Sequence, residues 1–505
     1  MPRWILPLFL LPTLAAPAIA QDDTATEAER DRATWNSVFE RSKARGWKWE
    51  ANEFLSEVVA DLHPGSALDI GMGQGRNSLF LAEGGWQVTG IDISDEAIAQ
   101  SLAQAKEAGL ELTALRADVN TFDYGEEKWD LVVGMYMHSL ITGNADKIMR
   151  SLKPGGLLVL EGFHRDLNRE SVEGGYFGFA THELLDAFAR LRVLHYEDLT
   201  DNSDWGRGGR NPIVRFVARK PYPTTGAGGP ALGADAPGME PSRVLDGIVN
   251  TEAIELNGVI ADGGREFWFT RRTEGVFRMF RMRIENGRWS HPHEVSLLPA
   301  GVDPLGVDMT LSADGQDLVF VGPGPSLDLW HARRGRFGWS TARRLSAPIS
   351  TESQEIYPCF VRDGSLYFSS NRAGGQGGSD LWRAQRQEDG SFAEAVNLGP
   401  TINTEHQEGD AWINPDETLM VFASDRPGGL GGYDLWISFR GDDGDWSAPR
   451  NLGPSFNSEA ADYCPMGTWN ESLFSFSRRD GRSWAEVTQG EIFWVDAAAL
   501  EAFRN

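Results

Sequence analysis

A run of closely spaced glycines in the first half of the chain is the segment best suited to bind a small ligand. Gly71, Gly73 and Gly75 follow Asp69, which stands at the expected end of a strand. Glycine has no Cβ atom, so its backbone can approach a ligand closely. A dinucleotide fingerprint needs its third glycine at position 76, where this chain has Arg76. The spacing therefore favours a loop that approaches an adenosyl group and an amino-acid tail.

Two further acids stand where they can complete this site. Asp92 ends the next expected strand, where a carboxylate can accept hydrogen bonds from both ribose hydroxyls. Asp118 follows Ala117 after the third strand. Together with the runs 130–133 and 153–156, these residues resemble the class I S-adenosylmethionine-dependent methyltransferases over roughly residues 35–220.

The resemblance implies a cofactor and its ligands. The cofactor is S-adenosyl-L-methionine, and in that family the acid at the place of Asp118 lies beside the adenine amino group. The implied cofactor-binding residues are Asp69, Gly71, Gly73, Gly75, Asp92 and Asp118. The longer run 73–82 resembles the tellurite-resistance branch, which methylates small, soft acceptors such as chalcogen oxyanions and thiol-like compounds. We therefore expect a small-molecule acceptor.

Methyl transfer depends mainly on alignment of the acceptor with the donor, and a base matters only when the acceptor must lose a proton. Tyr136 and His138 follow the fourth strand, and His164 follows the fifth. These three are the candidate catalytic residues, although each could instead be a capping or packing residue. His182 is expected to open a helix.

The chain offers little for a metal or a disulfide. His291 and His293 are the best ligand pair, and they fall in an expected turn without further ligands nearby, so no metal site is predicted. Cys359 and Cys464 are the only two cysteines, and the repeat pattern places them in units that are not neighbours. Both are expected to be unpaired thiols.

Alternating strands and helices must position the glycine loop. Short apolar runs predict strands over residues 67–70, 88–91, 112–115, 131–133, 157–160, 193–196 and 213–218. Helical patterns separate most of them, which predicts an α/β Rossmann-like domain over residues 35–220 with a mostly parallel seven-stranded sheet. The last two strands lack an intervening helix, so they should form an antiparallel edge. Residues 21–34 are expected to be a mobile lead, and residues 221–241 a flexible linker.

The second half repeats with a period of about 50 residues, which is typical of β-propeller blades. Asp-Leu-Trp recurs at residues 328, 380 and 434, and Thr-Glu or Ser-Glu pairs mark another phase of the same repeat. The marks predict a propeller over residues 242–505 with five blades, the segment 243–248 supplying the missing outer strand of the last blade. The runs 369–382 and 423–436 resemble TolB-like propeller repeats of bacterial envelope proteins. Their glycine loops are either architectural or a binding face for a protein or glycan.

The net charge limits the classes of partner, and the first 20 residues indicate where the protein is located. The formal net charge is −26, which argues against nucleic acid and against anionic lipid. Residues 1–20 resemble a signal peptide, with a short apolar stretch before Ala18-Ile19-Ala20, and no later run is long enough to span a membrane. The mature chain is therefore expected to be periplasmic or secreted, and cytoplasmic if the signal is not used.

Two functions are compatible with these features. The first is methyl transfer to a small acceptor, with the propeller as a partner- or substrate-binding module. The alternative is an envelope binding protein whose methyltransferase-like domain binds ligand without turnover, because the donor is made in the cytosol and an exported enzyme would lack it.

Overall fold

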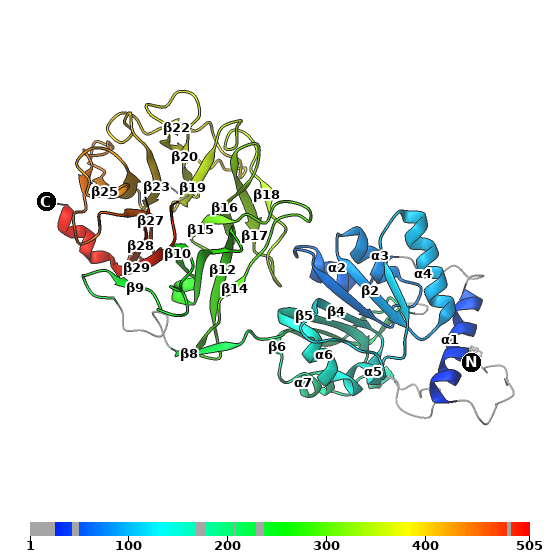
Figure 1. Ribbon diagram of the computed structural model, residues 1–505. Coiled ribbons are helices and arrows are strands. Elements are labelled where there is room, and N and C mark those ends of the chain that lie inside the picture. Colours follow the sequence, from blue (N-terminus) through cyan, green and yellow to red (C-terminus); the bar gives the residue numbers. More distant parts are fainter. Residues whose placement is uncertain are drawn as a thin grey trace, which may run out of the picture.

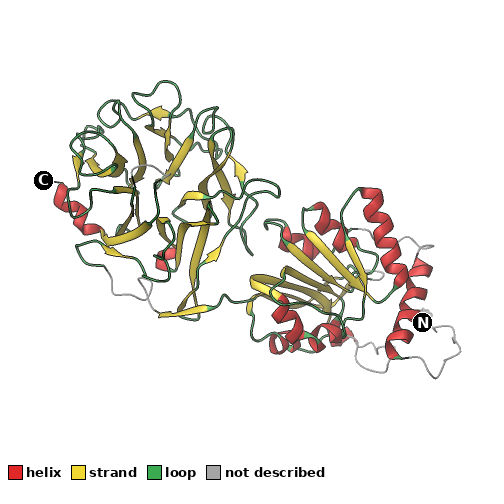
Figure 2. Cartoon of the chain, viewed as in Figure 1, coloured by secondary structure: helices red, strands yellow, loops and turns green. Residues whose placement is uncertain are grey.

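The computed structural model describes residues 26–42, 50–167, 178–205, 209–228, 237–481 and 486–504. An α/β domain formed by the first half of the chain stands beside a β-propeller formed by the second half (Figure 1). Helices cover the sheet of the first domain, whereas the propeller consists almost entirely of strands and loops (Figure 2). The predicted signal peptide, residues 1–20, lies outside the described residues.

The first described element is a helix where a mobile lead was expected. Helix α1 (Glu27–Ser42) begins at residue 27, so residues 27–34 correct that prediction. Thr26 and Glu29 form a capping box: the Glu29 amide donates to Thr26 Oγ1 at 3.3 Å, and the Thr26 amide donates to Glu29 Oε2 at 2.7 Å. An ion pair from Arg32 to Asp95 holds the helix against α4. The polar and charged residues of this segment therefore belong to an exposed helix and not to an unstructured lead.

The first domain contains the predicted sheet of seven strands. Their order is β3-β2-β1-β4-β5-β7-β6, and β7 runs antiparallel to both of its neighbours. The strands are β1 (Ser66–Ile70), β2 (Gln87–Asp92), β3 (Thr113–Arg116), β4 (Trp129–Met135), β5 (Leu152–Phe163), β6 (Arg192–Asn202) and β7 (Arg210–Arg219). The central strands are buried on both faces, as their continuous apolar runs require.

In the described part of this domain, six α-helices accompany the sheet beyond α1. They are α2 (Glu53–Val59), α3 (Arg76–Glu83), α4 (Asp95–Ala108), α5 (His138–Gly143), α6 (Ala145–Ser151) and α7 (Glu183–Ala187). Helix α3 starts directly after the glycine run and α4 directly after β2. Because β1, β2 and β4 are parallel, the loops that leave their carboxyl ends meet at one edge of the sheet.

The second domain is a propeller of five blades, as predicted. Blade 1 contains β10 (Glu255–Ala261), β11 (Glu266–Thr273), β12 (Val276–Glu285), β13 (Arg288–Ser290) and β14 (His293–Glu294). The next three blades are β15 (Val307–Leu311), β16 (Asp317–Pro323), β17 (Leu327–Arg333) and β18 (Arg343–Arg344); β19 (Glu355–Phe360), β20 (Leu366–Ser370), β21 (Asp380–Ala384) and β22 (Val396–Asn397); and β23 (Glu408–Ile413), β24 (Leu419–Ser424), β25 (Asp434–Phe439) and β26 (Arg450–Asn451).

The ring closes in the way that the repeat predicted. Blade 5 contains β27 (Ala461–Gly467), β28 (Leu473–Arg479) and β29 (Gly490–Asp496), and its outer strand is the early β9 (Ser242–Arg243). Asn250 reinforces the closure, because its side chain accepts from the Ile492 amide at 2.7 Å and donates to the Ile492 carbonyl at 2.9 Å. The two ends of the propeller are thus joined without a free sheet edge.

Part of the expected flexible linker is ordered. Within residues 221–241, Thr224–Gly228 form β8, which pairs with β13 of blade 1. The Thr225 hydroxyl donates to the Trp289 carbonyl at 3.0 Å. Backbone pairing needs no bulky apolar side chain, so composition alone did not reveal this strand.

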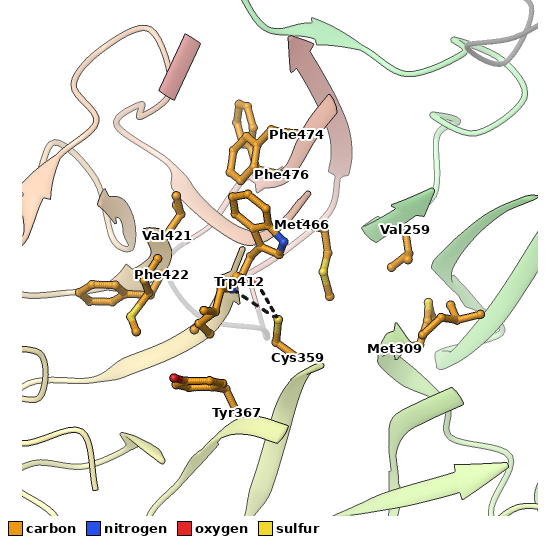
Figure 3. Close-up of a cluster of buried hydrophobic side chains, with 14 of the residues drawn as sticks. Val259, Met309, Cys359, Tyr367, Trp412, Val421, Phe422, Met466, Phe474 and Phe476 are labelled. Atoms are coloured by element: carbon orange, nitrogen blue, oxygen red, sulfur yellow. Dashed lines mark hydrogen bonds between the residues drawn. The ribbon is translucent and has the colours of Figure 1, made fainter. Parts of the chain in front are cut away.

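Aromatic and sulfur-containing side chains fill the space between the blades (Figure 3). The rings of Trp412 and Phe474, from blades 4 and 5, lie 5.6 Å apart. Cys359 Sγ accepts the amide of Ile413 at 3.4 Å, across the boundary between blades 3 and 4. Cys359 and Cys464 are both buried and unpaired, as predicted.

The two domains contact each other through the loop between β17 and β18. Phe337 of this loop is buried among apolar side chains of the first domain. The His63 amide donates to the Trp339 carbonyl at 2.8 Å, and Arg336 Nη2 lies 2.8 Å from His195 Nδ1. Among the described residues, none of the helices is both long and apolar enough to span a membrane.

Candidate functional site

The glycine run forms a tight loop between β1 and α3. Gly71, Gly73 and Gly75 have φ angles of 69°, 55° and 87°, in the left-handed region that favours glycine. A Cβ atom at Gly71 would lie 2.1 Å from Met137 Sδ, and one at Gly75 would lie 2.8 Å from Ser101 Cβ. The loop therefore requires glycine both for its backbone conformation and for close packing.

Asp92 lies against this loop at the end of β2. Its Oδ2 accepts the Gly73 amide and its Oδ1 accepts the Ser94 amide, each at 2.9 Å. The side chain is 8% exposed, and burial raises the pKa of Asp92 while those amides partly offset the rise. A carboxylate offers about four lone-pair positions. Asp92 therefore keeps acceptor capacity after binding two amides.

Asp69 lies beneath the loop rather than facing it. It is 1% exposed, and its Oδ2 accepts the Ser78 hydroxyl of α3 at 2.7 Å. Burial raises the pKa of Asp69 to about 6, against the opposing effect of the Ser78 hydrogen bond. This contact ties the end of β1 to α3.

Asp118 follows β3 at the same edge of the sheet. Its Oδ1 accepts the Asn120 amide at 2.8 Å, and its carbonyl accepts the amides of Thr121 and Phe122. The preceding amide, of Ala117, donates to the Asp92 carbonyl at 2.9 Å. Asp118 thus starts a turn whose position is set by the strand that carries Asp92.

Tyr136 lies at the carboxyl end of β4 and is bound to a buried acid. Its hydroxyl donates to Glu161 Oε1 at 2.7 Å. Burial and the Glu161 carboxylate hold the pKa of Tyr136 far above its ordinary value. With φ of 60°, Tyr136 is also in a backbone conformation that is uncommon for a bulky residue.

His138 packs beside Tyr136, and their ring centroids are 6.4 Å apart. Its Nε2 accepts the Phe163 amide at 3.0 Å, so this nitrogen carries no proton. Burial lowers the pKa of His138 to about 4, which makes the ring neutral at neutral pH. The ring therefore holds the end of β5 in place.

His164 follows β5 and contacts residues on the side of β6, away from His138. Its Nδ1 accepts the Asp166 amide at 3.1 Å, and its Nε2 lies 3.1 Å from Thr181 Oγ1. Asp198 of β6 is 3.8 Å from the same Nε2. The structure thus brings Tyr136 and His138 together and leaves His164 in a separate hydrogen-bonded group.

Comparisons with known proteins agree with this geometry. A family model described as a methyltransferase domain matches residues 67–156, from β1 to β5. A phosphatidylethanolamine N-methyltransferase of Cereibacter sphaeroides is 32% identical over 173 residues, which is 31% of this chain and 81% of that protein. The chain belongs to the S-adenosylmethionine-dependent methyltransferases. The cofactor of this methyltransferase is therefore S-adenosyl-L-methionine.

Other relatives of the methyltransferase are more distant. Hemagglutinin 1 of Eikenella corrodens is 28% identical over 175 residues, 33% of this chain. The chain spans about half the length of most curated relatives that it matches, and 58% of the hemagglutinin. The solved structure of TehB from Haemophilus influenzae is 20% identical, with a TM-score of 0.30 and coverage of 37% of this chain and 67% of that one.

The residues present at the methyltransferase loop fit the donor. The glycines keep the loop free of side chains next to Met137, and Asp92 retains acceptor positions for two hydroxyl groups. The Asp118 turn lies beside them at the same edge. These are the chemical requirements of an amino-acid tail, a ribose and an adenine amino group.

Sequence reasoning missed the buried acid of the methyltransferase site. Glu161 is 2% exposed, and besides Tyr136 it accepts from Asn52 Nδ2 at 2.7 Å and from Arg215 Nε at 2.8 Å. The signal was available, because a glutamate follows four apolar residues in the strand run Leu157–Leu160. A charge in a buried strand needs partners and marks a constrained site.

Arg76, which excluded a dinucleotide loop, has a structural partner. Its guanidinium binds the carboxylate of Asp204, with Nη2 3.0 Å from Oδ1. The next residue, Trp205, stacks on Tyr136 with ring centroids 5.9 Å apart. Arg76 thus connects the donor loop to a segment that covers Tyr136.

The residues with metal-ligand spacing are not the pair His291 and His293. His293 stacks on Tyr222, with ring centroids 3.8 Å apart. In the part of the chain that the structure describes, the group with metal-ligand spacing is Asp308, Asp410 and Cys464, from three blades. Cys464 Sγ lies 3.4 Å from Oδ1 of each acid, and burial raises the pKa of Asp308 to about 7. The group is thus already joined by its own hydrogen bonds.

Proposed function

We propose that this chain transfers a methyl group from S-adenosylmethionine to a small acceptor, and that the propeller binds a partner or the substrate. The observation that carries the proposal is the glycine loop closed against Asp92, whose carboxylate is held by two backbone amides and keeps acceptor capacity. In this proposal Asp92 binds the ribose hydroxyls, the loop contacts the amino-acid tail, and Asp118 lies beside the adenine. Asp69 positions the loop through Ser78.

The bound donor supplies a methyl group on a positively charged sulfur, so the protein must align the acceptor and exclude water. Tyr136, Phe163 and Trp205 form an aromatic group at the ends of β4 and β5, with Tyr136 and Phe163 centroids 5.0 Å apart. These rings are the proposed wall of the acceptor site. Glu161 holds the Tyr136 ring in position through its hydroxyl.

The protonation states of Tyr136 and His138 favour an acceptor that does not need to lose a proton before it is methylated. Tyr136 stays protonated at neutral pH because its pKa is raised by burial and Glu161. His138 is a weak base because burial lowers its pKa to about 4. Neither group takes a proton from the acceptor efficiently near pH 7. A thiolate or a chalcogen oxyanion needs no such base, which supports a small, soft acceptor.

The proposed location is the periplasm or the exterior of the cell, on the basis of residues 1–20, with the cytoplasm as the location if the signal is not used. A fusion of residues 1–25 to a reporter that is active only after export tests this. Export would favour the second candidate function, ligand binding without turnover, because the donor is made in the cytosol.

Donor binding to the full chain tests the proposal. Calorimetry with S-adenosylmethionine should detect binding, and Asp92→Ala should weaken it by about 10-fold or more, as expected when hydrogen bonds to a charged group are lost. Asp95→Ala is the matched control, because Asp95 is an exposed acid three residues away that pairs with Arg32. An unmodified chain that does not bind the donor would contradict the proposal.

Formation of S-adenosylhomocysteine then separates turnover from binding. Selenite, a small thiol and ethanolamine serve as acceptors, and product is expected with selenite or the thiol. Donor binding without product from any of the three would favour the binding protein. Product from ethanolamine alone would contradict the preference for a soft acceptor while leaving methyl transfer in place.

A further inference from the structure

A cavity lies between the two domains, separate from the glycine loop. Its volume is about 510 Å³, within the range of small-molecule sites, which are common at domain interfaces. One wall comes from α2, α3 and the residues that follow them, including Asp61, Phe80 and Trp86. The other wall comes from β17, β18 and their connection, including Arg333 and Arg343.

The propeller wall presents basic side chains on one face. His331 and Arg333 are two residues apart on β17, so they point to the same side of the blade. Arg343 of β18 is the cross-strand partner of His331, which places it next to both. Strand geometry therefore gathers three basic groups from two strands at one wall of the cavity.

Arg333 lies opposite Asp317 in the strand pairing, and its charge contributes to lowering the pKa of Asp317, but Asp317 binds another side chain. Asp317 binds His331: Nε2 of His331 lies 2.6 Å from Oδ1 of Asp317. This contact lowers the pKa of Asp317. Over the described ranges of the chain, neither Arg333 nor Arg343 forms an ion pair. Two other arginines of this blade do form ion pairs: Arg344 pairs with Asp328 at 2.8 Å, and Arg334 pairs with Glu266. In a chain of net charge −26, two unpaired guanidinium groups at a cavity wall form a local positive site.

The opposite wall is largely apolar. Phe80 and Trp86 line it, together with Leu62, Pro64 and Leu81. The acid on that side is Asp61, which lies on the segment after α2. Ser340 and Thr341 add hydroxyl groups on the propeller side. The cavity thus combines a basic wall, two hydroxyl groups, one acid and an aromatic wall, that is, apolar side chains with a few polar groups, as small-molecule sites have.

We propose that this cavity binds a small organic phosphate, a phosphomonoester with an aromatic or aliphatic body. Arg333 and Arg343 bind the phosphate oxygens, since guanidinium groups match phosphate geometry with paired donors. Phe80 and Trp86 contact the apolar body. Both domains contribute to the site, so the ligand bridges the methyltransferase and the propeller. This inference does not depend on donor binding or turnover.

Phenyl phosphate is the probe, measured by calorimetry on the full chain at about 50 mM salt, where screening is weak. We expect phenyl phosphate to bind at least about 5-fold more tightly than inorganic phosphate, and phenol not to bind detectably, because the site needs both a charge and an apolar body. The double variant Arg333→Ala/Arg343→Ala should weaken phenyl phosphate by about 10-fold or more.

Two controls keep this test specific. Arg288→Ala removes an exposed arginine of β13, outside the cavity, and should leave the affinity for phenyl phosphate unchanged. Asp92→Ala should also leave it unchanged, which separates this cavity from the donor site. A thermal unfolding midpoint equal to that of the unmodified chain reports that the double variant is folded, and Arg343→Lys should retain part of the affinity as a second variant.

Each other outcome overturns the inference. No binding of phenyl phosphate by the unmodified chain would exclude the site. Equal affinity for phenyl phosphate and inorganic phosphate would exclude a role for the aromatic wall. Binding that survives the double substitution, or that Asp92→Ala abolishes, would place the ligand elsewhere.

Discussion

Buried acids occur in both domains, but their partners differ. In the propeller, buried acids lie at the start of the inner strands of four blades, and each is bound by an arginine in the next strand or two residues after it. These acids are Glu255, Glu355, Glu408 and Asp462. Each also accepts the amide and the hydroxyl of a threonine or serine four residues earlier. In the methyltransferase domain, Asp92 has two backbone amides and no arginine among its described partners.

This difference in partners distinguishes acids that support the fold from an acid that can bind a ligand. A carboxylate that is repeated in successive blades and bound by an arginine, a hydroxyl and an amide has little acceptor capacity left. It holds the start of its strand and explains why a threonine or serine recurs four residues before it in the repeat. Asp92 occurs once, is 8% exposed and keeps free lone pairs beside a loop in which every second residue is glycine. Unsatisfied acceptor capacity, rather than burial, therefore indicates where a ligand binds.

The largest effect should come from breaking a propeller pair. Glu408 is fully buried, and Arg426 lies 3.0 Å from it and stacks over Phe422 and Trp436. Arg426→Ala leaves a buried charge without its partner, so the propeller should lose about 3–5 kcal/mol of unfolding free energy. Chemical denaturation measures this loss.

The control for that prediction is an exposed pair in the same domain. Arg362 and Asp416 are paired at 2.6 Å but are more than half exposed. Arg362→Ala should change the unfolding free energy by less than about 1 kcal/mol. Equal losses in the two variants would show that the buried acids are not the supports of the blades.

The comparison also explains what could be predicted from the sequence. The alternation of strands and helices and the 50-residue period predicted both folds. They also predicted closure of the ring by the early segment 243–248, and the structure pairs residues 242–243 with the last blade. The partners of Glu161 were not predicted, since Asn52 and Arg215 lie 109 and 54 residues away along the chain. The first part of helix α1, residues 27–34, was missed because a capping box, rather than apolar periodicity, defines its start.

The next largest effect should come from the glycine loop. Gly71→Ala places a Cβ atom 2.1 Å from Met137 Sδ at a φ of 69°. We expect a loss of about 1–3 kcal/mol of stability in the first domain, with weaker donor binding, because the left-handed strain and the clash add. Calorimetric unfolding with and without S-adenosylmethionine measures both.

Gly109→Ala is the matched control for the loop. Gly109 has a φ of 68°, but a Cβ atom there meets nothing within 4 Å. It carries the same backbone strain without the close approach. If the two variants lose the same stability and bind the donor equally well, close packing at Gly71 plays no part in the site.

A smaller effect should appear in the pH dependence of Asp69. Burial raises the pKa of Asp69 to about 6 in the folded protein, above its value near 4 when unfolded. The folded state therefore binds more protons than the unfolded state between those values, so this contribution to stability is complete below pH 4 and is lost as the pH rises through 6. The loss is of the order of 2 kcal/mol.

Asp69→Asn removes that titration and keeps an oxygen for the Ser78 hydroxyl. The stability of the variant relative to the unmodified chain should therefore rise between about pH 4 and pH 7. Unfolding curves measured across this range test the prediction. A difference that stays constant with pH would contradict the raised pKa of Asp69.

The smallest effect on stability should come from Asp92 itself, and it is the sharpest test of the comparison. Burial raises the pKa of Asp92 even though two amides bind it, so its negative charge is not favoured by the folded protein. Asp92→Asn removes that charge but turns an amide group toward one backbone donor. These effects oppose each other, and we expect a change in stability within about 1 kcal/mol.

Glu408→Gln is the same change of acid to amide in the propeller, where it separates a buried arginine from its counter-charge. It should reduce stability by more than Asp92→Asn does, while only Asp92→Asn should weaken the donor. Denaturation gives the stability of each variant, and titration with S-adenosylmethionine gives the donor affinity of each. A large loss of stability with Asp92→Asn and unchanged donor affinity would make Asp92 a structural acid like those of the blades. The free acceptor positions of Asp92 would then no longer identify the ligand site.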